Sequence, residues 1–291
     1  METAELLKKV RKIEIKTRGL SNQIFSGEYH SAFKGRGMAF SEVREYIPGD
    51  DVRAIEWNVT ARLNTPYVKV FEEERELNVV LLIDVSASGN FGTQVQFKKD
   101  LITELCAVIA FSAATNNDKI GVIFFSDKIE KFIPPKKGRS HVLRIIRELI
   151  NFEPSASGTD VALGLKFLTN AIKKKSIAFL ISDFVSPDFT DAIKIANRKH
   201  DLVALRIYDK AEQSIPKIGL VKIRDNETGQ IIWVNTNSDQ FRKNYSLRVS
   251  AFEKKLKDIF NRAGVDHTEI NAIQGYIKPL MNLFKRRESR R

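Results

Sequence analysis

The sequence predicts an α/β fold in which a mainly parallel sheet is covered by helices on both faces. Three short apolar runs, rich in β-branched residues, have the character of strands that are buried on both sides; they occupy residues 78–84, 119–126 and 176–182. Segments with the apolar spacing of amphipathic helices follow these runs, at 95–115, 138–152, 161–172 and 188–199. Because strands that alternate with helices pair in parallel, we expect one doubly wound sheet.

Three further strands complete a predicted sheet of six. Residues 128–134 alternate between apolar and polar side chains and end at Pro134, which favours a short antiparallel edge strand. Residues 201–208 form another apolar run after the helix that precedes them. Residues 265–270 are expected to complete the sheet at its edge, and a closing helix is expected over 275–285.

The alternation of strands and helices is interrupted at residues 217–235. Two apolar runs flank Asp225–Gly229 there and predict an inserted hairpin. A long helix is expected over 240–263 and should end at Gly264, since glycine commonly terminates helices in the left-handed conformation. We therefore divide the chain into three parts: an N-terminal extension (1–75), an α/β domain (76–285) and a basic tail (286–291).

The N-terminal extension combines glycines and prolines with dense mixed charge, which predicts irregular structure with short strands. Charged residues surround Trp57 in the sequence: Arg44, Asp50, Asp51, Arg53, Glu56 and Arg62. We expect these charges to pair locally and form a brace, with Trp57 and Tyr46 as apolar anchors against the main domain. A surface for a partner protein is the alternative.

Composition excludes several classes of protein. The 291 residues contain no apolar stretch near the ~20 residues of a membrane span. A single cysteine, Cys106, rules out an internal disulfide and a zinc cage. The net charge of +12 first suggests nucleic acid, but residues 211–291 hold 16 basic and 9 acidic residues and therefore most of the excess. Because no nucleic-acid motif accompanies this charge, binding to nucleic acid is not favoured.

Polar residues with metal-binding chemistry follow the first and third buried strands. Asp84, Ser86 and Ser88 alternate at the end of the first strand, Asp183 ends the third, and Thr159 lies in a loop before a helix. Carboxyl ends of parallel strands meet at one edge of a sheet, so these side chains are expected there together. Their hard oxygen donors favour Mg²⁺ or Mn²⁺. The alternative is that they only cap helices or form hydrogen bonds.

This residue set resembles the metal-ion-dependent adhesion site of von Willebrand factor A domains. The segment from Gly35 to Phe40, the run from Arg44 to Trp57, and Ala61-Arg62 are in turn similar to the signature of the bacterial domain of unknown function 58 family. The resemblance implies a von Willebrand A-like fold over 76–285. It also implies that Ser86, Ser88 and Thr159 offer hydroxyls to a divalent ion, which Asp84 and Asp183 bind directly or through water.

The expected function is a non-enzymatic, metal-dependent protein-interaction module in the cytoplasm. Such sites leave one coordination position open, which an acidic residue of a partner protein can fill. The family resemblance implies that the partner is an AAA+ ATPase of the MoxR type and that the chain serves as an adaptor or chaperone-like factor. A metal-dependent hydrolase acting on phosphoesters is the alternative, and a nucleic-acid-binding protein is a weaker one. We predict no catalytic residues.

Overall fold

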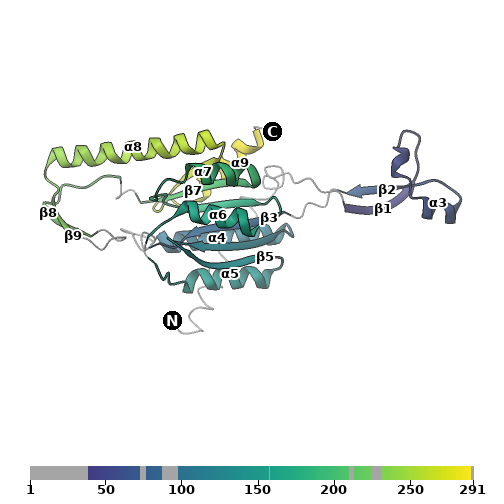
Figure 1. Cartoon of the computed structure of the whole chain (residues 1–291), viewed down its shortest axis with the longest axis horizontal. Coiled ribbons are helices and arrows are strands. Elements are labelled where there is room, and N and C mark those ends of the chain that lie inside the picture. The colour runs from purple at the N-terminus through teal and green to yellow at the C-terminus, as the bar shows by residue number, and fades with distance from the viewer. Residues whose placement is uncertain are drawn as a thin grey trace. The chain divides into compact units, whose positions relative to one another are not determined.

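The computed structural model of the chain describes residues 39–72, 77–86, 98–156, 158–209, 213–224 and 231–289. It contains a small unit, Phe33–Leu77, and a main unit that includes everything from Asn78 onward. Figure 1 shows the helices and strands of both units. Among the helices of the described ranges, none is long and apolar enough to cross a membrane.

A six-stranded sheet forms the centre of the main unit, with the strand order β10-β7-β6-β3-β4-β5. Its strands are β3 (Asn78–Asp84), β4 (Lys119–Phe125), β5 (Ile129–Lys136), β6 (Ile177–Ser182), β7 (Asp201–Tyr208) and β10 (Asp266–Asn271). Every neighbouring pair is parallel except β4 and β5. The structure therefore confirms the six strands, the antiparallel edge strand and the position of the last strand at the other edge.

Helices cover both faces of this sheet, because side chains along a buried strand point alternately to each face. They are α4 (Lys98–Thr115), α5 (Arg139–Asn151), α6 (Val161–Ala171), α7 (Thr190–Lys199) and α8 (Asp239–Ala263). Val80 and Leu82 of β3 belong to a core cluster with residues of α6, α7 and α8. Ile83, which points the other way, lies beside residues of α4 and α5. Residues 79–83 are almost completely buried as a result.

The interruption expected at 217–235 is a hairpin, as the sequence predicts. Strands β8 (Leu220–Arg224) and β9 (Ile231–Asn235) pair antiparallel and lie outside the six-stranded sheet. Helix α8 begins after Ser238, whose hydroxyl accepts a hydrogen bond from the Phe241 N–H. It ends at Gly264, which has a φ of 64° and so adopts the left-handed conformation that favours glycine.

The small unit holds β1 (Ala39–Glu45), the short 3-10 helix η1 (Val52–Ala54), α3 (Trp57–Leu63) and β2 (Tyr67–Glu72). Strands β1 and β2 pair antiparallel. Arg44 binds both oxygens of the Asp50 carboxylate at 2.7 Å, and Glu56 pairs with Lys69. These charges therefore pair within the unit. Trp57 is 68% exposed there, and its role as an anchor against the main domain stays a prediction.

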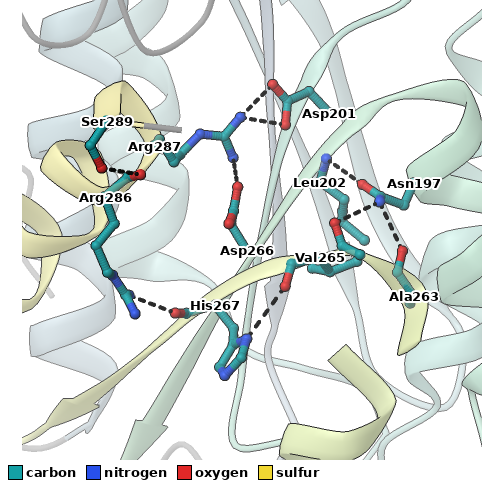
Figure 2. A network of polar contacts seen from close by, with 11 residues as sticks. Asn197, Asp201, Leu202, Ala263, Val265, Asp266, His267, Arg286, Arg287 and Ser289 are labelled. Carbon is teal, nitrogen blue, oxygen red and sulfur yellow. Dashed lines mark hydrogen bonds and ion pairs between the residues drawn. The ribbon is translucent and has the colours of Figure 1, made fainter. Parts of the chain in front are cut away.

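The last helix, α9 (Ile277–Ser289), continues four residues beyond the expected end of the domain at 285. Residues 286–289, assigned from the sequence to a basic tail, form its final turn. Figure 2 shows the reason. Arg287 is 6% exposed, donates to both carboxylate oxygens of Asp201 at 2.6 and 2.7 Å, and pairs with Asp266 at 2.9 Å. Both aspartates begin parallel strands, so this arginine fastens α9 to the sheet.

Replacing Arg287 by methionine should lower the free energy of unfolding by about 3–5 kcal/mol, because it leaves two partly buried carboxylates without their cation. The neighbouring Arg286 is the matched control, since it is exposed and donates to the backbone carbonyl of His267 at 3.2 Å. Its replacement by methionine should cost less than about 1 kcal/mol. Urea unfolding measures both changes, and equal losses for the two variants would contradict this account of the network.

Candidate metal centre

Asp84, the last residue of β3, is the most buried acid of the expected site. Its side chain lies at the carboxyl edge of the sheet, where β3 runs between β4 and β6. The residue is 6% exposed, and both carboxylate oxygens accept hydrogen bonds. Oδ1 accepts from the backbone N–H of Ser86 at 3.0 Å, and Oδ2 accepts from the hydroxyl of Ser182 at 2.6 Å. The carboxylate is therefore held in one orientation by its own loop and by the neighbouring strand.

The turn after β6 carries the second expected acid, Asp183. Ser182 links this turn to β3, because its oxygen donates to Asp84 and accepts from the N–H of Phe184 at 2.9 Å. Phe184 has a φ of 64°, which is unusual for a bulky residue and is held here by its complete burial against Phe189 and Phe260. Strain of this kind persists where packing enforces it and is frequent at functional sites.

The two carboxylates interact electrostatically. Burial raises the pKa of Asp84 to about 6, and the charge of Asp183 acts in the same direction. Both effects penalise the ionised form, since a buried carboxylate loses hydration and a second negative charge repels it. A cation at this edge of the sheet would relieve both.

One cation of the chain already lies at this place. The ammonium of Lys98, the first residue of α4, is 3.8 Å from Oδ2 of Asp183, and the lysine side chain is only 2% exposed. The sequence analysis did not identify this residue. Among the described residues, the buried ammonium of Lys98 therefore lies beside the acidic pair before any metal is considered.

The loop before α6 brings Thr159 to the same edge. The backbone N–H of Asp160 donates to the carbonyl of Ser126 after β4, and the N–H of Val161 donates to the hydroxyl of Ser186 after β6. The loop thus bridges the carboxyl ends of the two strands that flank β3. Thr159 is 7% exposed, and within the described part of the chain its buried hydroxyl has no hydrogen-bond partner.

A buried hydroxyl without a partner is rare, because leaving it unpaired costs about 1–3 kcal/mol. A divalent ion would satisfy it, so the residues present fit a metal of the expected kind. The donors are oxygens of two aspartates, of Ser86 and of Thr159, the ligand type that Mg²⁺ and Mn²⁺ prefer. No group of three or more His, Cys, Asp and Glu that could hold a metal occurs in the described ranges.

Four of the five expected ligand positions lie among the described residues, and the fifth, Ser88, lies outside them. Asp84 and Ser86 are in direct contact, and Asp183 acts on Asp84 through its charge. Thr159 reaches the same edge through the contacts of its loop. Cys106 is completely buried in α4 and takes no part.

Two residues that the sequence analysis gave no role contribute to the site. The hydroxyl of Ser182 joins the two strand ends, and the adjacent polar residues Ser182 and Asp183 at the end of the apolar run are the signal that could have revealed it. Lys98 is buried beside Asp183. A lysine is solvated by default, so the sequence carries no signal that marks it as part of the site.

The fold and this edge of the sheet define a von Willebrand factor A-like domain. The chain belongs to the family described as "Protein of unknown function DUF58", whose model matches residues 42–255. The match covers most of the chain, including β2, the six-stranded sheet up to β7, and the loops that carry Asp84, Thr159 and Asp183.

Curated relatives come from bacteria. The chain is 26% identical over 288 residues to the uncharacterized protein Rv1480 of Mycobacterium tuberculosis, covering 97% of this chain and 86% of the relative. It is 28% identical over 109 residues to the uncharacterized protein YeaD of Bacillus subtilis, covering 38% of this chain and 25% of that protein.

Among solved structures, the chain resembles an aerotolerance-related membrane protein from Bacteroides fragilis. The TM-score is 0.50 at 14% identity, and the match covers 74% of this chain and all of that one. At this identity the similarity establishes the fold alone.

Replacing Thr159 by valine should affect the stability of the metal-free protein and of the metal-bound protein differently. Without metal, the free energy of unfolding should stay unchanged or rise by about 1 kcal/mol, because a buried hydroxyl without a partner is removed. With millimolar Mg²⁺, the variant should lose most of the rise in melting temperature that the ion gives the unaltered protein.

The matched control for this experiment is Thr103→Val. Thr103 is also buried, but its hydroxyl donates to the carbonyl of Lys99 at 2.8 Å. This control should be slightly less stable without metal and should keep its response to Mg²⁺. Thermal unfolding in EDTA and in Mg²⁺ measures both variants, and an unaltered metal response in Thr159→Val would remove Thr159 from the ligand set.

Proposed function

We propose that the chain is a non-enzymatic module that binds a partner protein through a divalent metal ion. Asp84, Ser86, Ser88, Thr159 and Asp183 would hold Mg²⁺ or Mn²⁺. The observation that carries the proposal is the buried hydroxyl of Thr159, which has no described partner at the edge where two carboxylates interact. A hydroxyl and a carboxylate pair that are unfavourable alone become favourable together when a cation joins them.

A bound divalent ion would supply a position open to one more oxygen ligand. Mg²⁺ takes six ligands in octahedral geometry and gives up its waters reluctantly, so the protein groups alone do not saturate it. An aspartate or glutamate of the partner is the ligand of matching charge and hardness. The ion would then be part of the interface, and binding would require it.

The positions of the histidines support a binding role over a hydrolytic one. His141 contacts the carbonyl of Ile120 near the start of β4, His200 directly precedes β7, and His267 is the second residue of β10. All three therefore lie at the amino end of parallel strands, at the edge opposite Asp84. No histidine of the described residues is thus placed to act as a general base at the metal centre.

The more specific proposal is that the partner is an AAA+ ATPase of the MoxR type and that the chain acts as a cytoplasmic adaptor or chaperone-like factor. This rests on the resemblance of the N-terminal signature to the family, and the family match over residues 42–255 supports the membership on which it depends. The metal-binding step and the identity of the partner are separate claims, and each has its own experiment.

Isothermal titration with Mn²⁺ tests the metal. The unaltered protein should bind one ion, and Asp84→Asn or Asp183→Asn should weaken binding by at least about tenfold, since each variant removes one of two anionic ligands. Asp191→Asn is the control, because this aspartate is highly exposed on α7. The proposal fails if the first two variants bind Mn²⁺ as tightly as the control.

Binding of a purified MoxR-type ATPase from the same genome tests the partner. Immobilised protein should capture the ATPase in Mg²⁺ and release it in EDTA, and Asp84→Ala should behave in Mg²⁺ as the unaltered protein does in EDTA. Capture that is insensitive to both changes would exclude the metal as a bridge. Turnover of a phosphoester in Mn²⁺ that disappears in Asp183→Ala would support the hydrolase instead.

A further inference from the structure

Lys98 is a buried cation placed where a metal would bind. Its side chain is 2% exposed, and its ammonium lies 3.8 Å from Oδ2 of Asp183. Burying an ammonium is costly unless a carboxylate compensates for the lost hydration. Among the described residues, the carboxylate of Asp183 provides this compensation.

The charges of the site explain this arrangement. Asp84 and Asp183 contribute two negative charges when both are ionised, and Lys98 contributes one positive charge. These three side chains then sum to a charge of −1, so the repulsion between the carboxylates is partly compensated. A divalent ion added to the same three side chains changes the net charge to +1, and like charges now repel at short distance in a region that excludes water.

We propose that Lys98 is an internal counter-ion that stabilises the acidic pair in the metal-free protein and opposes the binding of a divalent ion. This inference rests on the proposed metal-dependent function and adds a residue that regulates it. The affinity of the site for metal is set by the competition between a tethered monovalent cation and a free divalent one. When the ion binds, the ammonium must either move away from Asp183 or stay in place and lower the affinity for the metal.

A purely structural role for Lys98 has the opposite consequence for metal binding. If the lysine only positioned Asp183, its removal would disorder a ligand and lower the affinity of the site for the metal. If the lysine competes with the ion, its removal raises that affinity. The direction of the change in affinity therefore distinguishes the two roles, even where both predict lower stability without metal.

Isothermal titration with Mn²⁺ of the full-length protein and its Lys98→Met variant tests the inference. Methionine keeps the unbranched apolar stem and removes the charge. We expect the dissociation constant for Mn²⁺ to fall by at least about tenfold in this variant. Lys174→Met is the control, because Lys174 is exposed before β6, at the other end of the strand from Asp183, and its removal changes the net charge equally. The control should bind Mn²⁺ as the unaltered protein does.

A second arm in EDTA does not depend on the metal. Lys98→Met should lower the melting temperature, and adding Asp183→Asn to it should restore part of that loss, because the uncompensated carboxylate is then gone. Unchanged or weaker Mn²⁺ binding in Lys98→Met, or the absence of this coupling in EDTA, would overturn the inference while leaving the metal site in place. Failure of the unaltered protein, of Lys98→Met and of the control to bind Mn²⁺ would overturn the proposed function as well.

Discussion

The side-by-side parallel pairing of β3 and β6 is the constraint on which the site depends. It makes the two strands end at one edge, so that Ser182 reaches Asp84 across the strand boundary at 2.6 Å and Asp183 follows in the same turn. Two acids are thereby held where hydration is poor, and their mutual repulsion follows from the strand order. Two other groups lie at this edge. The buried ammonium of Lys98 interacts favourably with the acidic pair, and the hydroxyl of Thr159 would interact favourably with a cation that the pair attracts.

The mainly parallel sheet and the two acids at its edge could be predicted from the sequence because they follow from general rules. Continuous apolar runs separated by amphipathic helices specify a parallel sheet, and parallel strands place their carboxyl ends together. Lys98 and Arg287 could not be predicted in the same way. A lysine or arginine is solvated by default, and only the fold reveals that each is buried against aspartates that are distant in the sequence.

These buried cations also change the meaning of the net charge. The basic residues at the end of the sequence suggest a tail, but Arg287 forms ion pairs with Asp201 and Asp266 within the fold. Arg206 of β7 is similarly buried and pairs with Glu253 of α8 and Glu269 of β10. Part of the positive charge therefore stabilises contacts between elements and is not offered to a polyanion, which weakens the argument for nucleic acid that net charge alone would make.

The charges of the proposed site, with Lys98 inside it and a carboxylate supplied by a partner, favour binding of the metal and the partner together. Asp84, Asp183 and Lys98 together would carry −1 without the proposed ion and +1 with it, so neither state of these three side chains would be neutral. A carboxylate from a partner brings the sum of ion, lysine and three acids to zero in a region where uncompensated charge is costly. Metal and partner acid would then bind more tightly together than separately, and by linkage each would raise the affinity for the other by the same factor. A module of this kind would hold its metal firmly only in the complex, which is the behaviour expected of an interaction that must be reversible.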